Sequence, residues 1–404
     1  MVPETSVQSE IARGSEASII NLVNSLVEHA QTARASDIHI DPHANCVKVR
    51  IRVDGVLLDS YTLPKELHAP VVSRIKVMAR LRTDEHQAAQ DGRFRAEIAG
   101  NPVDIRISII PTYYGENAVL RLLSDKSAQF TLESIGFSKP DQEKIMRAAR
   151  RPHGMILSTG PTGSGKTTTL YTLIKMLNSI DTSIVTIEDP IEYAIEGIEQ
   201  IQVNPGRGLT FADGLRSILR QDPNIIMVGE IRDTETASIA VNTALTGHLL
   251  LSTLHTNDAA TTLPRLLDMK IEPFLVASTV NIAIAQRLVR KICPDCKHAR
   301  EFSDAERASL SETLPEKLIV GIKRVYEGKG CEECGNTGYR GRTVIGEVLV
   351  VDDEIREVML RKGSASEIKQ IAVKNGMTTM VEDGIRKSIA GDTTLQEVLR
   401  VTHE

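Results

Sequence analysis

One short segment constrains the fold of this chain more than any other. Residues 160–167 read Gly-Pro-Thr-Gly-Ser-Gly-Lys-Thr and match the pattern G-x-x-x-x-G-K-[ST] at every fixed position. The segment follows an apolar run, Met155–Thr159, and opens a stretch with helical periodicity, Thr167–Leu177. Its glycines let the backbone curl so that N–H groups face a phosphate, and the helix N-terminus adds a partial positive charge. This strand–loop–helix context predicts a P-loop that binds a nucleoside triphosphate.

Individual side chains of the loop have separate predicted roles. Lys166 adds a full positive charge at the phosphates, and the hydroxyl of Thr167 is a ligand for Mg²⁺. A chance Gly/Ser-rich turn is the alternative, and the flanking strand and helix argue against it. The residues that we expect to bind ATP are Gly160, Pro161, Thr162, Gly163, Ser164, Gly165, Lys166, Thr167 and Thr168.

Acidic residues follow two further apolar runs, where a nucleotide-binding sheet places its metal and water ligands. Ile225–Val228 leads through a glycine to Glu230, so this carboxylate is set back from the strand and we expect it to reach Mg²⁺ through water. Ile184–Ile187 leads to Glu188, and Glu192 follows it closely. Two such carboxylates allow one to hold the metal while the other polarises water. A solvated loop acid is the alternative, and it is strongest for Glu192.

A histidine follows a fourth apolar run. Leu249–Thr253 leads through Leu254 to His255, which is placed to contact the γ-phosphate of a bound nucleotide. An isolated histidine more often packs or lies at the surface, so that alternative stays open. His248, which precedes the run, is a weaker candidate.

The order of apolar and helical segments predicts two architectures. An amphipathic helix over Ser15–Arg34 is followed by two clusters of strands, which indicates an α+β domain. From Pro140 to Arg290, strands alternate with helices, as in a parallel sheet covered on both faces. A polar, small-residue stretch between the two reads as a linker. The predicted divisions are residues 1–125, a linker at 126–139, a nucleotide-binding core at 140–292, a cysteine-containing subdomain at 293–335 and a helical region at 336–404.

Four of the five cysteines form two C-x-x-C pairs separated by 34 residues. The pairs are Cys293 with Cys296 and Cys331 with Cys334. Two such pairs can close a tetrahedral Zn²⁺ site with no open position, so the zinc would be structural. Free thiols and disulfides are the alternatives, and a disulfide suits a reducing compartment poorly. Cys46, in a predicted strand, is most simply a small buried hydrophobic residue.

Composition narrows the functional classes. The formal net charge is −5, aromatic residues make up 3% of the chain, and there is no tryptophan. These values argue against a nucleic-acid binder, which needs positive charge and stacking rings. The first 18 residues lack an apolar core, and no apolar run is long enough for a membrane span, so we expect a cytosolic protein whose membrane role is peripheral.

Taken together, these segments resemble the ATPases of type II secretion and type IV pilus assembly systems. The resemblance covers nearly the whole chain, and the joint occurrence of its motifs is far more specific than a P-loop alone. The motifs are Ala35–His39, Arg52–Gly55, Gln90–Arg93, the P-loop, the family's Asp box at Thr186–Glu192, Arg220–Pro223, Gly229–Asp233, its His box from Gly247 to Asn257, and the cysteine quartet.

The resemblance implies a RecA-like P-loop core with a parallel-rich sheet, preceded by an α+β (PAS-like) domain and followed by a tetracysteine zinc subdomain and C-terminal helices. It implies Glu188 as general base, Glu230 as the Mg²⁺-associated acid and His255 as a γ-phosphate contact. It also implies arginines supplied in trans, for which Arg93 and Arg106 are the candidates. A surface or ion-paired role is the alternative for both.

The resemblance further implies a hexameric motor that hydrolyses ATP at subunit interfaces beneath the inner membrane. Domain movement about the linker would turn a membrane-embedded platform protein and extract pilin subunits. The cysteine quartet favours assembly or secretion over retraction. We interpret the chain as a pilus assembly ATPase, with type II secretion as the alternative, because it starts almost at the family's second domain and a further N-terminal docking domain is not evident.

Two other classes stay open. The first is a zinc-ribbon ATPase stimulated by nucleic acid, although the acidic charge balance argues against it. Its basic patch would comprise Arg287, Arg290, Lys291, Lys297 and Arg300. The second is a P-loop kinase of a small molecule, which would need an acceptor pocket that the sequence does not reveal.

Overall fold

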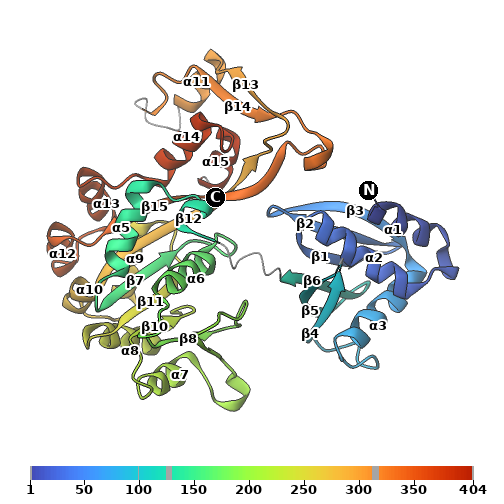
Figure 1. The fold of residues 1–404 in the computed structure, drawn as a ribbon, viewed down its shortest axis with the longest axis horizontal. Coiled ribbons are helices and arrows are strands. Elements are labelled where there is room, and N and C mark those ends of the chain that lie inside the picture. The colour runs from blue at the N-terminus through green and yellow to red at the C-terminus, as the bar shows by residue number, and fades with distance from the viewer. Residues whose placement is uncertain (1, 99, 124–129, 312–317, 403–404) are drawn as a thin grey trace. The chain divides into compact units, whose positions relative to one another are not determined.

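The structure is a computed structural model that describes residues 2–98, 100–123, 130–311 and 318–402 (Figure 1). The chain divides into two compact units, which we call the N-terminal unit, Met1–Ala128, and the C-terminal unit, Gln129–Glu404. The first is an α+β unit and the second contains a parallel-rich sheet, so the predicted fold class is confirmed. Residues 129–404 form one compact unit, and the finer divisions predicted at 292 and 335 therefore stay predictions.

An antiparallel sheet forms the N-terminal unit, with strand order β3-β2-β1-β6-β5-β4. Its strands are β1 (Ala35–Pro42), β2 (Cys46–Val53), β3 (Val56–Pro64), β4 (Gln90–Ile98), β5 (Asn101–Thr112) and β6 (Gly115–Leu123). Its helices are α1 (Val2–Ala12), α2 (Ile19–Thr32) and α3 (His68–Met78). Residues alternate along the strands, so that Ile105 and Ile107 are buried in the core while Arg106 points to the opposite face. Helix α1 was not predicted.

The sheet of the C-terminal unit has the order β15-β12-β7-β11-β10-β8-β9, and β15 runs antiparallel to β12 while the other strands are parallel. Its strands are β7 (Gly154–Thr159), β8 (Ile184–Glu188), β9 (Glu199–Gln202), β10 (Ile225–Val228), β11 (Leu249–Leu254), β12 (Val280–Ile292) and β15 (Tyr339–Val350). Every residue of β7, β8, β10 and β11 is buried. Side chains alternate between two cores, with Met155 and Leu157 in one and Ile156 in the other, as expected for a sheet covered on both faces.

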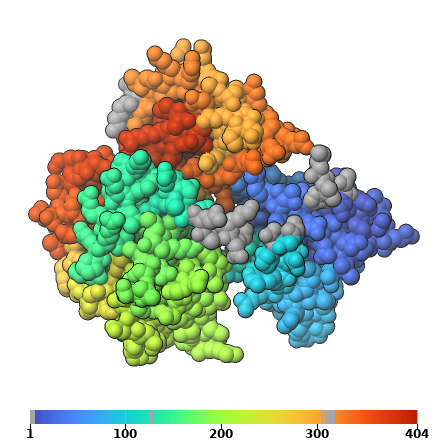
Figure 2. Space-filling model, in the orientation of Figure 1, coloured from blue at the N-terminus to red at the C-terminus, as the bar shows by residue number. Residues whose placement is uncertain are grey.

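Helices cover this sheet, and four more helices follow its last strand in the described part of the chain. They are α5 (Lys139–Ala149), α6 (Lys166–Leu177), α7 (Phe211–Ile218), α8 (Thr234–Leu245), α9 (Ala259–Asp268), α10 (Pro273–Thr279), α12 (Asp353–Leu360), α13 (Ala365–Lys374), α14 (Met380–Ala390) and α15 (Leu395–Thr402). Between the cysteine pairs, β13 (Lys297–Glu301) and β14 (Arg324–Gly328) form a small antiparallel sheet with α11 (Asp304–Ser311). Figure 2 shows the dark red surface of the last helices against the orange surface of this insert, where Ile385 packs with Phe302 and Val325.

The second part of the predicted linker, residues 130–139, is folded. Residues 124–129 lie outside the described part of the chain, but Leu132–Ile135 form α4, a single helical turn. Thr131 and Ser134 make a capping box at its start, and Gly136 ends it with a φ of +114°. Leu132, Ile135 and Phe137 are buried in the C-terminal core. Residues 130–139 therefore belong to the C-terminal unit rather than to the linker.

Candidate nucleotide site

The P-loop connects the end of β7 to the start of α6. Gly160, Gly163 and Gly165 have φ values of +143°, +77° and +88°, a region that other residues rarely adopt. A Cβ atom at Gly160 would also lie 2.5 Å from the main-chain oxygen of Gln286 on β12. The glycines at these positions are thus required by the backbone path.

Lys166 is the first residue of α6, and its side chain is buried within the loop. Its Nζ donates to the main-chain oxygens of Gly160 at 2.8 Å and Pro161 at 2.9 Å. Burial lowers the pKa of this ammonium to about 8; Arg287 lowers it further, and the charge of Glu230 opposes the shift. Phosphate oxygens are stronger acceptors for this cation than main-chain carbonyls are.

Parallel pairing of β10 and β11 places Glu230 and His255 together. Both residues follow the carboxyl ends of their strands, and His255 Nε2 lies 3.3 Å from one carboxylate oxygen of Glu230. The other oxygen accepts from Arg232 at 2.5 Å, a partner that the sequence analysis did not identify. Because β7, β11 and β10 are parallel neighbours and the P-loop follows β7, Lys166 lies at the same edge of the sheet as Glu230 and His255.

Glu188 lies at the end of β8, where it was predicted, but the residue is 2% exposed and both of its carboxylate oxygens accept hydrogen bonds. One oxygen accepts from the Thr186 hydroxyl at 2.6 Å and the Gln200 amide at 3.1 Å. The other accepts from the hydroxyl of Tyr171 on α6. Burial, and then the charge of Glu188, raise the pKa of Tyr171. This network ties α6, β8 and β9 together.

The same tyrosine also fixes the segment after β8. The main-chain N–H of Glu192 donates to the Tyr171 hydroxyl at 3.3 Å, and the side chain of Glu192 is half-buried. Sequence reasoning missed Tyr171 and Gln200 because neither belongs to a motif. Their contacts with Glu188 span 17 and 12 residues and depend on the packing of α6 and β9 against β8.

Arg93 and Arg106 lie on the exposed face of the N-terminal sheet. Residues paired across neighbouring strands share a face, and the register sets Arg93 opposite Arg106 and Arg106 opposite Arg121. Arg121 in turn faces Asp37, to which it donates at 2.9 Å. Burial alone would raise the pKa of Asp37, but its hydrogen bonds and the neighbouring arginines lower it. We call Arg93, Arg106 and Arg121 the arginine row; the sequence analysis did not select Arg121.

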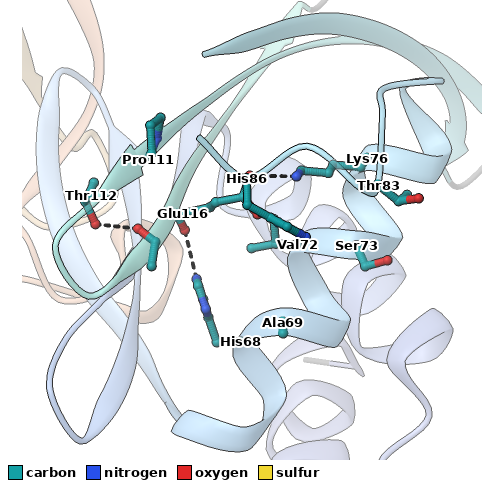
Figure 3. Close-up of a pocket in the computed structure, with 11 residues that line it drawn as sticks. His68, Ala69, Val72, Ser73, Lys76, Thr83, His86, Pro111, Thr112 and Glu116 are labelled. Atoms are coloured by element: carbon teal, nitrogen blue, oxygen red, sulfur yellow. Dashed lines mark hydrogen bonds and ion pairs between the residues drawn. The ribbon is translucent and has the colours of Figure 1, made fainter. Parts of the chain in front are cut away.

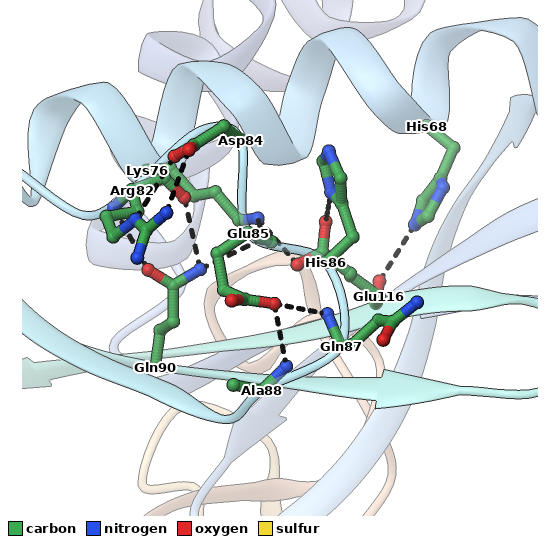
Figure 4. Close-up of polar contacts among 10 residues, drawn as sticks. All are labelled: His68, Lys76, Arg82, Asp84, Glu85, His86, Gln87, Ala88, Gln90 and Glu116. Carbon is green, nitrogen blue, oxygen red and sulfur yellow. Dashed lines mark hydrogen bonds and ion pairs between the residues drawn. The ribbon is translucent and has the colours of Figure 1, made fainter.

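A polar cluster fixes the segment that leads into β4 (Figure 4). Lys76 of α3 is fully buried, pairs with Glu116 at 2.6 Å and donates to the main-chain oxygen of Glu85 at 2.5 Å. Gln90, the first residue of β4, donates to the same oxygen at 3.2 Å. Burial alone would raise the pKa of Glu116, but hydrogen bonds from Lys76 and His86 lower it. Lys76, His86 and Glu116 also border a pocket of about 280 Å³, which Figure 3 shows.

The four cysteine sulfurs predicted to bind zinc lie together. The distances are 3.8 Å between Cys293 and Cys331, 3.9 Å between Cys296 and Cys334, and 3.7 Å between Cys331 and Cys334. A tetrahedral site with Zn–S bonds of about 2.3 Å places its sulfurs about 3.8 Å apart, whereas a disulfide requires about 2.05 Å. The donor set therefore fits zinc. Cys46 is half-buried rather than buried as predicted.

Two of the five residues in the basic patch considered for nucleic acid pair with acidic side chains. Arg290 pairs with the buried carboxylate of Glu397 at 2.7 Å. Arg300 pairs with Glu306 at 2.5 Å and with Glu327 at 3.0 Å. These cations stabilise the fold and are less available to phosphates.

Within the described residues, no helix is long and apolar enough to cross a lipid bilayer.

Comparison with known proteins gives consistent matches over nearly the whole chain. The profile of the family described as Type II/IV secretion system protein matches residues 12–400. Type II secretion system protein E of Xanthomonas campestris pv. campestris is 49% identical over 394 residues, which cover 96% of this chain and 68% of the relative. Type IV pilus assembly ATPase PilB of Myxococcus xanthus is 46% identical over 398 residues, covering 98% and 70%. The crystal structure of the pilus retraction motor PilT with bound ADP has a TM-score of 0.62 and 25% identity, and the match covers 94% of this chain and 97% of that one.

Proposed function

The chain belongs to the type II/IV secretion system protein family of ATPases, and we propose that it is a hexameric cytoplasmic motor that hydrolyses ATP to power type IV pilus assembly. The observation that carries this proposal is that Glu230 and His255 contact each other at the edge of the sheet where the P-loop and Lys166 lie. A type II secretion ATPase is the second candidate, because a protein of that name is 49% identical to this chain.

The P-loop residues would hold the triphosphate, and Thr167 and Glu230 would hold Mg²⁺. That ion neutralises charge on the β- and γ-phosphate oxygens when bound. Lys166 orients the same phosphates, and the imidazole of His255 contacts the γ-phosphate from the end of β11. The pairing of His255 with Glu230 fixes the orientation of the ring and links the metal side of the site to the γ-phosphate side.

We propose a different role for Glu188 from that of the general base predicted from the sequence. A base must be reached by water, and Glu188 is 2% exposed, with three protein donors on its two carboxylate oxygens. We therefore assign Glu188 a positioning role. Glu192, which is half-buried and anchored through its main chain to Tyr171, is the residue that we propose to activate the water.

The arginine row would act on the nucleotide of a neighbouring copy. Its guanidinium groups lie on the solvent face of the N-terminal sheet, away from the core, and such groups stabilise the charge that spreads over a γ-phosphate during hydrolysis. A ring of copies gives every P-loop a neighbour that supplies this row. The hexamer, the cytoplasmic location and an inner-membrane platform protein as partner are parts of this proposal.

Zinc would be held by the four cysteines and would stabilise the insert between β12 and β15. Main-chain N–H groups of Cys331 and Gly338 point at the Cys334 sulfur at 3.2 Å each, an arrangement that stabilises a thiolate. We expect the purified protein to contain one zinc per chain by mass spectrometry under native conditions. Absence of the metal from protein purified without chelator would contradict this assignment.

The motor proposal is tested in the native host. Deletion of the gene should abolish surface pili and leave protein export unchanged, and wild-type protein but not Lys166→Ala should restore the pili. Loss of exported proteins with normal pili would instead select the type II secretion candidate. Restoration of either by Lys166→Ala would contradict a role for ATP hydrolysis altogether.

A further inference from the structure

A chain of three threonine hydroxyl groups joins the strand before the P-loop to the segment that contains His255. Thr159 is the last residue of β7 and is fully buried. Its Oγ1 lies 2.6 Å from the hydroxyl oxygen of Thr256, and it accepts from the Thr256 main-chain N–H at 2.9 Å. Thr256 continues the chain to the hydroxyl of Thr262 on α9 at 3.0 Å.

The Thr159 hydroxyl contacts both neighbours of His255. Besides the two contacts with Thr256, its Oγ1 lies 2.9 Å from the main-chain oxygen of Leu254 and 3.1 Å from that of Thr256. A hydroxyl offers one proton and two lone pairs. One side chain can therefore accept from the chain after His255 while it donates to a carbonyl beside it.

These contacts begin where the strand pairing stops. The last pair of the β7–β11 ladder joins Thr159 to Leu254, and β11 ends there. His255 is thus the first residue beyond the ladder, and the pairing of strands no longer fixes its position. The hydroxyl of Thr159 provides the next attachment, and Thr159 directly precedes Gly160, the first residue of the P-loop.

We propose that Thr159 is a positioning residue for His255 and sets the distance between the P-loop and the imidazole that contacts the γ-phosphate. This inference rests on the role proposed above for His255. Loss of the hydroxyl leaves the strands paired but frees the segment that carries the imidazole. The effect should therefore fall on turnover rather than on ATP binding, since Lys166 and the loop glycines are untouched.

The test compares three variants in steady-state ATPase assays. Thr159→Val keeps the side-chain volume and removes the hydroxyl; we expect kcat to fall about tenfold, because a small misplacement of a catalytic group is costly, with a change in KM for ATP below about twofold. Thr159→Ser keeps the hydroxyl and should retain kcat. Thr279→Val is the control, because the Thr279 hydroxyl is also buried but bonds to Leu275 O next to the start of β12, at the opposite end of the sheet from the P-loop.

A double-mutant cycle with His255→Ala separates positioning from general loss of stability. If Thr159 acts through His255, Thr159→Val should lower kcat no further in the His255→Ala background. A full tenfold loss in that background would overturn the inference while leaving the role of His255 intact. An unchanged kcat in His255→Ala alone would instead remove the proposed role of His255, and this inference with it.

Thermal unfolding monitors the fold of each variant. If Thr159→Val does not fold, Thr256→Val removes the other hydroxyl of the pair and keeps the main-chain contact to Thr159. It should then show a smaller fall in kcat that also disappears in the His255→Ala background. Equal losses of kcat with and without His255 would overturn the inference for this variant too.

Discussion

The two faces to which we assign phosphate contacts differ in how closely their side chains interact with one another. On the C-terminal unit, a cation, a carboxylate and an imidazole converge beside the P-loop and contact or act on one another. On the N-terminal unit, the arginine row has its own acidic anchor, Asp37, at one end, while Arg93 at the other end has no ion-pair partner among the described residues.

The two faces are suited to different parts of the proposed reaction. Binding and metal chemistry need groups held in fixed relation to one another, and strands of one sheet supply that relation. The arginines that we propose to stabilise charge on a neighbouring copy's γ-phosphate must be presented to that copy, and an exposed sheet face can present them. Variants of the two faces should therefore fail in different ways.

The largest effect is expected at Lys166. Lys166→Ala removes the buried cation of the P-loop, so both ATP binding and turnover should fall to background. Isothermal titration with ATP and a phosphate-release assay measure the two losses. An ATPase rate near that of the wild type would show that the P-loop is not the site of hydrolysis.

Substitution in the arginine row should affect turnover but not ATP binding. Arg106→Ala should lower kcat by about 10³-fold while ATP still binds. Mixed with Lys166→Ala, it should regain activity, because an intact P-loop of one variant then meets an intact arginine row of the other. Arg95→Ala is the matched control, since Arg95 lies on β4 beside the row and pairs with Asp104 at 2.8 Å. Two inactive variants that stay inactive when mixed would contradict sharing of the site between copies.

The sequence predicted the first face better than the second, and the reason is physical. Glu230 and His255 follow apolar runs of a parallel sheet, whose carboxyl ends meet at one edge, so their proximity follows from the pattern alone. The alignment of Arg121 with Arg106 depends on strand register, which no motif encodes.

Local signals explain two further differences. The capping box of Thr131 and Ser134, followed by Gly136, could have identified α4 within the predicted linker. The hydrogen bond between Tyr171 and Glu188 could not have been found in this way, because it depends on how α6 packs against β8. The role of Glu188 was therefore interpreted from its place in the chain, without the partners that occupy it.

The two acids after β8 provide the next comparison. Glu192→Gln should lower kcat by about 10²-fold with little change in melting temperature, as expected for loss of a general base. Glu188→Gln should lower the melting temperature as well, because a carboxylate that accepts three hydrogen bonds is replaced, and kcat by only about tenfold. The opposite ranking in kcat would return the base to Glu188.

The smallest effect that we expect is a change in the KM for ATP with pH. It should arise from Lys166 and not from the arginine row. Burial lowers the pKa of the Lys166 ammonium to about 8, whereas the arginine row consists of guanidinium groups. Because ATP binds the protonated ammonium, the KM for ATP should rise about tenfold between pH 7 and pH 9, while the ratio of kcat between wild type and Arg106→Ala stays constant. The same lowered pKa means that the unfolded chain binds more protons than the folded one between about pH 8 and pH 10.5, so Lys166 makes the free energy of unfolding rise with pH in that window. A KM that is flat to pH 9, measured by initial rates at saturating Mg²⁺, would show that the bound triphosphate restores the ordinary pKa of the ammonium and that the charge of Lys166 does not limit binding.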